Sequence, residues 1–293
     1  MANIEPAEMG LKPFRKPVRF MLAADQGWKQ RLHLVYQDFH EGVTLWRLIW
    51  ALAFSDIRLR YRGSAIGPFW MTISTGVQIG AMAVVYADLF HTDIRTYLPF
   101  LTVSMIIWGY LSSLIINGCS CFIGAEGLIK GTRMPFMVHA MRSILRDTIV
   151  FGHNLVVIVI VLLVMRVHQS FYTLMVIPGF LLWLLNGLAI SLALGAICAR
   201  FRDIPQIVGA VMQIAFFVTP IMWSADVLKT HKLAETLIHL NPFLYMLDII
   251  RNPLLGQPLG WVEIARALLV SAIIIAGSLL IFARTRGRIA FWV

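Results

Sequence analysis

The sequence predicts an all-α integral membrane protein with six transmembrane helices, an N-terminal amphipathic interfacial helix and a re-entrant helical hairpin before the last span. Three observations lead to this fold class. Of the 293 residues, 59% are hydrophobic and only 14% are charged, whereas a soluble domain carries about 25% charged residues. Six stretches stay apolar over the roughly 20 residues that a helix needs to cross a bilayer. A short segment rich in Arg and Trp precedes the first of them.

Residues 1–40 are predicted to form a cytoplasmic N-terminal extension that is partly disordered. They contain several Lys and Arg residues but no apolar core followed by a small-residue cleavage site. This composition does not fit a signal peptide.

Residues 41–63 are predicted to form an amphipathic helix on the membrane surface. A polar stripe recurs every three or four residues, at Arg47, Ala51, Ser55, Arg58 and Arg62. The other side is largely apolar and carries Trp46, Ile49, Trp50, Ala53, Ile57 and Tyr61. This pattern is typical of an interfacial helix, with its apolar face in the acyl boundary and its Arg side chains near lipid phosphates. The alternative, a buried helix of a soluble N-terminal domain, lacks other segments that could build such a domain.

Residues 64–293 are predicted to form one transmembrane domain. Its spans are expected at about residues 69–90, 97–122, 143–165, 170–199, 204–225 and 262–283. Pro178-Gly179 predicts a kink or an early break in the fourth span.

The region 226–260 is predicted to be re-entrant. It holds Pro242, Pro253 and Pro258 between apolar runs that are too short to cross a membrane. Two short helices that dip into the bilayer and return would fit this pattern, and so would a hairpin on the surface. Irregular backbone within a membrane must be shielded by protein or water, so a re-entrant pair would lie near a pathway or a dimer centre.

The basic residues orient the chain. With the N-terminus in the cytoplasm and alternating loops, most of the 25 Lys and Arg residues fall on the cytoplasmic side, as the positive-inside rule requires. Both termini are therefore predicted to be cytoplasmic. The net charge of +10 then reflects topology and contact with membrane lipids, and no nucleic-acid partner is expected.

Motifs for chemistry are missing from the chain. It contains no G-x-x-x-x-G-K-[ST] loop for ATP, no H-E-x-x-H and no G-x-S-x-G. Cys119, Cys121 and Cys198 lack the spacing of a metal site. We therefore expect no catalytic residue and no metal in this chain. A membrane enzyme acting on lipid-linked sugars is the less favoured alternative, because it would need an acid/base pair or a nucleophile.

Three groups of short motifs resemble those of ABC-2 type polysaccharide export permeases, the transmembrane subunits of O-antigen, capsule, galactan and teichoic acid ABC transporters. The first group is Asp56–Ser64 with Gly67–Trp70. The second is Glu126–Lys130 with Met134–Phe136, although Gly124-Ala125-Glu126 stands where an asparagine-containing run is usual. The third comprises Arg202–Ile204, Thr219–Ile221, Leu240–Pro242 and Arg251. The likeness covers about residues 44–293.

The resemblance implies half of a transporter in the bacterial inner membrane. Two copies of the chain would form the pathway, and two copies of a separate ABC ATPase would bind ATP and Mg, so no cofactor is expected in this chain. The substrate would be a lipid-linked polysaccharide. The Gly67–Trp70 run and the Phe291–Val293 ending look most like the O-antigen and galactan branch. An ABC-2 exporter of another lipid or of a drug is the alternative.

The small number of spans favours a dimer independently of the resemblance. A bundle of six helices fills its own core, so a polymer-wide path is physically easier between two copies. The alternative is a monomer that binds a lipid in a side groove.

Two charged groups are candidate contact sites. In the loop 124–142, Glu126, Lys130 and Arg133 are predicted to couple to the ATPase. The alternative is a solvated loop on the positive side. The group Arg58, Arg60 and Arg62 is predicted to bind lipid phosphates or the pyrophosphate of a carrier lipid through charge-assisted hydrogen bonds. Contact with the ATPase and simple anchoring are the alternatives.

Aromatic residues are candidates for the pathway, since sugar rings stack on flat apolar faces. The predicted set is Trp108, Tyr110, Phe216, Phe217 and Tyr245. The alternative is that these rings pack in the bundle or form a belt at the membrane surface.

Overall fold

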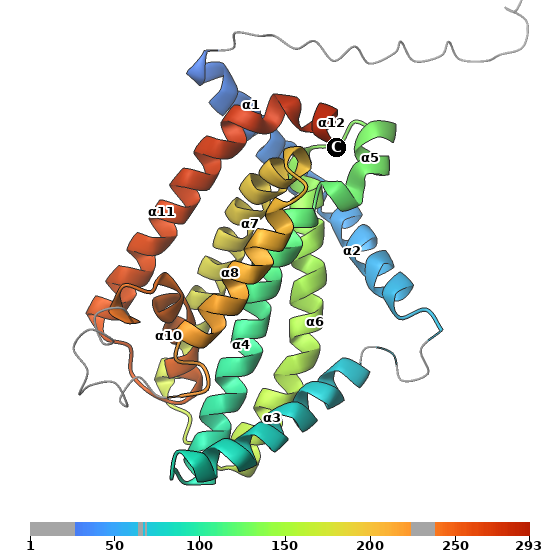
Figure 1. The fold of residues 1–293 in the computed structure, drawn as a ribbon. Helices are drawn as coiled ribbons and strands as arrows, with labels where there is room; N and C mark the ends of the chain where they lie inside the picture. The colour runs from blue at the N-terminus through green and yellow to red at the C-terminus, as the bar shows by residue number, and fades with distance from the viewer. Residues whose placement is uncertain (1–26, 64–66, 68, 224–237) are drawn as a thin grey trace, which may run out of the picture.

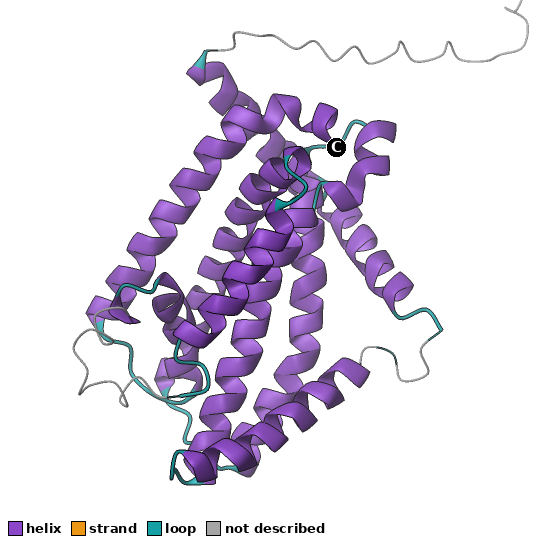
Figure 2. Ribbon diagram, in the orientation of Figure 1, coloured by secondary structure: helices purple, strands orange, loops and turns teal. Residues whose placement is uncertain are grey.

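The computed structural model describes residues 27–63, 67, 69–223 and 238–293. Every regular element in this part of the chain is helical, with no strand (Figures 1 and 2). Five helical segments are long and apolar enough to cross a membrane. They are α3 (Phe69–Leu89), α4 (Ile94–Ser120), α6 (Phe136–Val164), α7 (Val176–Arg200) with the preceding turn η3 (Phe171–Met175), and α11 (Trp261–Thr285) with its continuation through η5 (Arg286–Arg288) and α12 (Ile289–Trp292). The prediction of an all-helical, multi-pass membrane protein is confirmed for these residues.

The fifth predicted span, 204–225, contains a shorter helix. Helix α8 (Ile204–Val218) has 15 residues, which span about 22 Å at 1.5 Å per residue, less than the bilayer core of about 30 Å. The reason lies at its C-terminal end. Thr219 precedes Pro220 and has extended backbone angles, because a residue before proline is pushed out of the helical region.

Helix α6 begins earlier than the predicted start at residue 143. Pro135 precedes its first turn, and proline is favoured at helix starts because it has no backbone N–H to leave unbonded. The first half of α6 carries polar side chains, including His139, Arg142 and Asp147. These residues lowered the hydropathy of the segment, although they continue the same helix.

Two helices occupy the N-terminal region. Helix α1 (Trp28–Thr44) runs across the predicted boundary between residues 40 and 41, and residues 1–26 of the predicted extension lie outside the described residues. Helix α2 (Trp46–Arg60) follows after a break at Leu45.

The apolar side of α2 serves two purposes. Ile49, Ala53 and Ile57, spaced by four, are buried where α2 packs on α6. Trp46 and Trp50 remain exposed and are available to the membrane. The predicted amphipathic helix is therefore also a packing element of the bundle.

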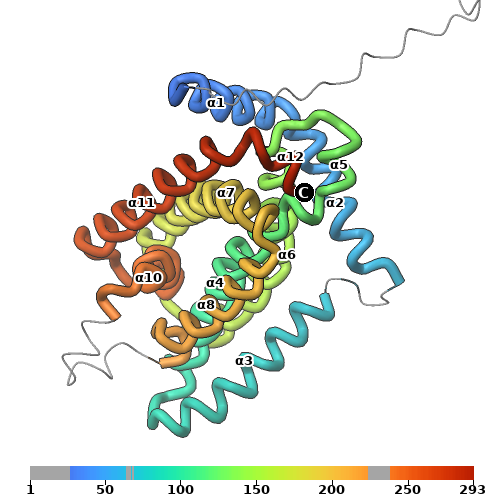
Figure 3. Tube along the Cα trace, turned by 45° about the horizontal axis from the view of Figure 1, so that its top comes forward, coloured from blue at the N-terminus to red at the C-terminus, as the bar shows by residue number. Residues whose placement is uncertain are grey.

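Helix α4 forms the centre of the bundle. It packs against α3, α6, α7, α8 and α10, and Figure 3 shows it surrounded by its neighbours. Its contact with α7 is close because both helices carry small residues. A Cβ atom added to Gly118 would lie 2.8 Å from Ser191 Oγ and 3.1 Å from Ser191 Cα. Small residues allow such approach between membrane helices.

The region 226–260 contains α10 (Pro242–Leu254), while residues 224–237 lie outside the described part of the chain. Asn241 caps α10 and its Nδ2 donates to Thr219 Oγ1 at 2.8 Å. The buried Arg251 donates to the Pro220 carbonyl at 2.6 Å and forms an ion pair with Asp248. Motif residues that are distant in sequence thus meet where α8 ends and α10 begins.

The elements divide between two ends of the bundle (Figure 1). Helices α1, α5 (Glu126–Gly131) and α12 gather at one end together with the C-terminus, which we call the α5 end. The α3–α4 turn and α10 lie at the other, the α10 end.

Candidate functional site

The first candidate site is the exposed surface of α5. This short helix follows the 3₁₀ turn η2 (Ile123–Ala125) and leads into the chain before α6. Lys130 Nζ lies 2.6 Å from Glu126 Oε1, one helical turn away, and both side chains are exposed. The hydrogen bond and charge of Lys130 lower the pKa of the Glu126 carboxyl, which favours its ionised form. Arg133 is also exposed. Helix α5 and the residues that follow it therefore present both signs of charge to the solvent.

The three predicted arginines at the end of α2 have different surroundings. Arg58 is exposed and its guanidinium lies 4.7 Å from the centre of the Phe54 ring. Arg62 is exposed beyond the helix end. Arg60 lines a cavity. The sequence placed the three together by proximity, but Arg60 is two residues from Arg58 along α2 and therefore points to a different side of the helix.

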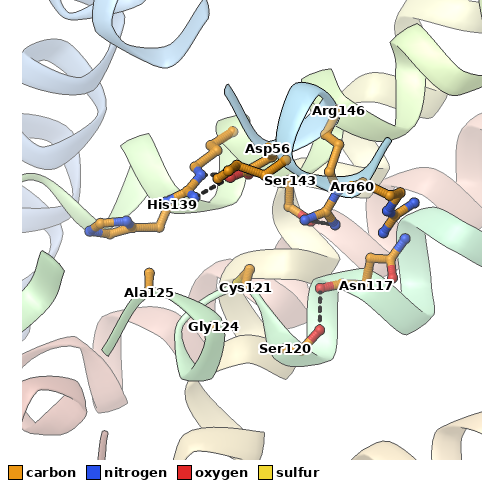
Figure 4. Close-up of a pocket in the computed structure, with 12 residues that line it drawn as sticks. Asp56, Arg60, Asn117, Ser120, Cys121, Gly124, Ala125, His139, Ser143 and Arg146 are labelled. Carbon is orange, nitrogen blue, oxygen red and sulfur yellow. Dashed lines mark hydrogen bonds and ion pairs between the residues drawn. The ribbon is translucent and has the colours of Figure 1, made fainter. Parts of the chain in front are cut away.

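The cavity lies between α2, the end of α4, η2 and the first half of α6, with a volume of about 400 Å³. Figure 4 shows the basic side chains that line it. Arg142 on α6 forms an ion pair with Asp56 on α2, with Nε 2.7 Å from Oδ2. This pair fixes α2 to α6 at one wall. Arg146 Nη2 donates to Ser143 Oγ at 3.1 Å.

Two polar groups beside the cavity are buried without full hydrogen bonding. His139 is 1% exposed and neither of its ring nitrogens has a partner among the described residues. Asp147 accepts from Asn117 Nδ2 at 2.9 Å through Oδ1, while its Oδ2 has no partner there. Such groups cost free energy unless something satisfies them.

A further polar contact holds the α5 end together. Asp38 on α1 accepts from the backbone N–H of Phe136 at 3.1 Å and of Met137 at 2.9 Å, at the start of α6. It also accepts from Arg286 Nη2 at 2.9 Å. One buried carboxylate therefore joins α1, α6 and the C-terminal segment.

Most of the predicted pathway aromatics lie inside the bundle. Tyr110 stacks on Phe151, Phe180 and Trp183, and its hydroxyl lies 2.7 Å from Thr148 Oγ1. Trp108 is buried beside Phe216 and Phe243, and Tyr245 is buried with its hydroxyl accepting from Arg266. Phe216 is half-buried, whereas Phe217 is 65% exposed. Among the predicted pathway aromatics, only Phe216 and Phe217 on α8 reach the surface in this conformation.

The sequence reasoning missed the α6 side of the cavity. His139, Arg142, Ser143 and Arg146 recur at intervals of three and four, which places them along one face of a helix. That spacing was the available signal. It was overlooked because the helix was predicted to begin at residue 143.

Comparisons with known proteins agree with this architecture. Residues 47–255 match the family model described as ABC-2 type transporter. A Myxococcus xanthus protein named O-antigen export system permease protein RfbA is 21% identical over 200 residues, covering 68% of this chain and 77% of that protein. Two Klebsiella pneumoniae proteins of the same name are 24% identical over 225 residues, covering 75% and 80%, and 23% identical over 251 residues, covering 84% and 95%.

The family match covers more than half of the chain and includes α2, α5 and the helices between which the cavity lies. Permeases of this family are non-catalytic transport subunits and work with an ABC ATPase. The chain is therefore a multi-pass membrane permease subunit that belongs to the ABC-2 type transporter family.

Proposed function

We propose that the chain is the permease subunit of an ATP-driven exporter that moves a lipid-linked polysaccharide, O-antigen-like or galactan-like, across the bacterial inner membrane. The observation that carries this proposal is the match to three proteins named as O-antigen export permeases, over 68% to 84% of the chain. The sequence motifs quoted above support the same substrate class.

In the proposed assembly, two copies of the chain enclose the pathway above two copies of the ATPase, which bind ATP and Mg. The packing of a single copy supports this arrangement. Rings of Tyr110, Phe151, Phe180 and Trp183 fill the space between α4, α6 and α7, so a polymer would pass between copies and not through one. A monomer that binds lipid in a side groove is the alternative, and cross-linking in native membranes that finds only monomers would favour it.

We propose that the α5 end is cytoplasmic and contacts the ATPase through Glu126, Lys130 and Arg133. Two features support this. The helix α5 is short, exposed and charged, and the C-terminal residues Arg284, Arg286 and Arg288 lie at the same end. A concentration of basic residues favours the cytoplasmic side.

We propose that α8 completes a sixth crossing and that the region 226–260 is re-entrant. Helix α7 ends near the α5 end and α11 begins near the α10 end (Figure 1). The chain between them therefore has to pass from the α5 end to the α10 end, which is one more crossing. Asn241 donates to Thr219, and Arg251 on α10 donates to the Pro220 carbonyl. These contacts fix the end of α8 to α10 and support a re-entrant region at membrane depth. A thiol reagent should label Asp203→Cys and Leu240→Cys from opposite sides. Labelling of both positions from the same side would contradict the proposed sixth crossing.

Contacts with the substrate are proposed at two places. Arg58, Arg60 and Arg62 would meet phosphates of the carrier lipid or of membrane lipids. Phe216 and Phe217 would face the polymer first, because they are the least buried of the predicted aromatics. Trp108, Tyr110 and Tyr245 would join the pathway only after the bundle rearranges.

The test is co-purification with the ABC ATPase, followed by ATP turnover with and without carrier-linked glycans. The proposal expects a stable complex whose turnover changes with lipid-linked polysaccharide. If ATP turnover responds to a drug or an unglycosylated lipid and not to the glycan, the proposed substrate class is wrong and that compound class takes its place. Failure to form any complex with the ATPase would contradict the proposed function as a whole.

A further inference from the structure

The cavity beside α2 is open because two packed helices diverge. Ile49, Ala53 and Ile57 are buried against α6, but the last turn of α2 leaves that contact and Arg60 is exposed. The gap of about 400 Å³ lies within the range of about 300–1,000 Å³ typical of small-molecule sites. Its lining is polar and cationic, so a drug-like apolar ligand would not match it.

The charges in the cavity do not cancel. Three guanidiniums line it, from Arg60, Arg142 and Arg146. Asp56 holds Arg142, and Asp147 lies 3.4 Å from Arg146. No described carboxylate forms an ion pair with Arg60. One positive charge is therefore left over, and Figure 4 shows the Arg60 and Arg146 side chains on the same side of the cavity.

His139 provides an independent indication of a ligand. His139 is one of the residues that line the cavity, on the side opposite Arg60 and Arg146 in Figure 4. Its side chain is only 1% exposed, and neither ring nitrogen has a hydrogen-bond partner within the described structure. A buried polar group without a partner costs free energy comparable to a lost hydrogen bond. A bound group whose hydrogen-bonding oxygens extend from the arginines to His139 would supply the missing contact.

We propose that this cavity binds the phosphate groups of a lipid headgroup, with Arg60 and Arg146 as the principal contacts and His139 at its inner wall. Guanidinium groups pair with phosphate oxygens through two parallel hydrogen bonds, which gives both strength and orientation.

The exposed aromatic residues of α2 favour a lipid as the source of the phosphate. Trp46, Trp50 and Phe54 are exposed on α2, and aromatic residues of this kind anchor helices at the headgroup level. The part of the cavity lined by Leu59 and Arg60 at the end of α2 would therefore lie beside lipid phosphates. That the occupant is the diphosphate of a carrier lipid rests on the proposed function, whereas binding of a phosphate headgroup does not.

The experiment measures binding of radiolabelled farnesyl diphosphate to the full chain purified with its ATPase in detergent. Arg60→Gln removes one cavity contact, and Arg47→Gln removes the same charge from an exposed site on the same helix, away from the cavity. We expect Arg60→Gln to weaken binding about tenfold or more, as the loss of a charge-assisted contact does, and Arg47→Gln to bind normally. Equal effects of the two variants would overturn the proposal.

A steric variant tests the cavity without changing its charge. Gly124 lines the cavity, and a Cβ added to it meets no atom within 4 Å. Gly124→Leu should therefore fill space and reduce binding about tenfold or more, with an unchanged elution volume in gel filtration. Unchanged binding in this variant would also contradict the site.

Competition identifies the source of the phosphate. Displacement of the label by farnesyl diphosphate but not by phosphatidylglycerol would assign a carrier diphosphate, and equal displacement by both would assign a general lipid phosphate. Displacement by inorganic pyrophosphate at the same concentration as by farnesyl diphosphate would overturn the lipid assignment. These outcomes are separate from the proposed function, because glycan-dependent ATP turnover can persist in a complex whose cavity binds no phosphate.

Discussion

Asp38 illustrates what single residues contribute to this fold and why sequence alone did not reveal it. Its carboxylate bonds two backbone N–H groups at the start of α6 and also Arg286. These partners lie 98 to 248 residues away in the chain, and no local pattern connects them. Residues with local signals were easier to predict, such as Glu126 and Lys130, whose spacing of four brings them together on one helical turn.

The Asp38 contact predicts a stability effect. Asp38→Asn keeps the shape but removes the charge and one acceptor, leaving a buried N–H or the Arg286 guanidinium without its partner. We expect the free energy of unfolding to fall by about 1–3 kcal/mol, measured by SDS titration in mixed micelles. Glu41→Gln, an exposed change one turn away on α1, is the control. Equal stability of the two variants would show that Asp38 does not hold the helices together.

Reversing a charge on α5 is predicted to lower coupling to the ATPase without changing insertion of the chain into the membrane. Lys130→Glu should lower glycan-stimulated ATP turnover by roughly fivefold to tenfold if the surface meets a charged partner, while insertion into the membrane is unchanged because the side chain is exposed.

The double exchange Glu126→Lys with Lys130→Glu separates the two roles of the pair. It restores the ion pair within α5 but presents the opposite charge order to the ATPase. Coupling should stay low in this variant. Recovery of full turnover would mean that the pair only stabilises the helix.

At the level of elements, hydropathy predicted the presence of helices better than their limits. The polar residues in the first half of α6 delayed its predicted start, although they lie on a face that packs against α2 or lines the cavity. Helix α8 ends early because proline follows Thr219. The face of α2 that packs on α6 was predicted to face lipid, since an apolar stripe has the same pattern whether lipid or protein covers it.

The α4–α7 contact predicts a packing effect. Gly118→Ala places a methyl group against Ser191, including its backbone Cα at 3.1 Å, and should destabilise the protein by about 1–3 kcal/mol because a close-packed interface has no room for it. Gly109→Ala on the same helix meets no atom within 4 Å and should change stability little. The comparison uses the same SDS titration. A smaller loss at Gly118 than at Gly109 would mean that the two helices are less closely packed than the structure indicates.

At the level of the whole molecule, the proposed function depends on which elements share the α5 end of the bundle and which share the α10 end. The order of apolar segments predicted which loops share a side, but not that α1, α5 and the C-terminal residues come together in one surface, since that depends on contacts between distant segments. The cavity could not be predicted for the same reason, because its walls come from three separate parts of the chain.

This arrangement predicts the pattern of surface labelling. The three native cysteines are buried, so single cysteines introduced at exposed positions give a low background. Gly127→Cys and Gly287→Cys should react with a membrane-impermeant thiol reagent from the cytoplasmic side, and Thr92→Cys from the other side. Reaction of positions 127 and 287 from opposite sides would contradict the shared end.

The most direct measurement is transport in proteoliposomes that contain the chain, its ABC ATPase and a lipid-linked polysaccharide on the outer leaflet. The account predicts that the glycan becomes protected inside the vesicles only when both subunits and hydrolysable ATP are present. Protection that is equally fast without ATP hydrolysis, or no protection in a complex that hydrolyses ATP in response to the glycan, would contradict it.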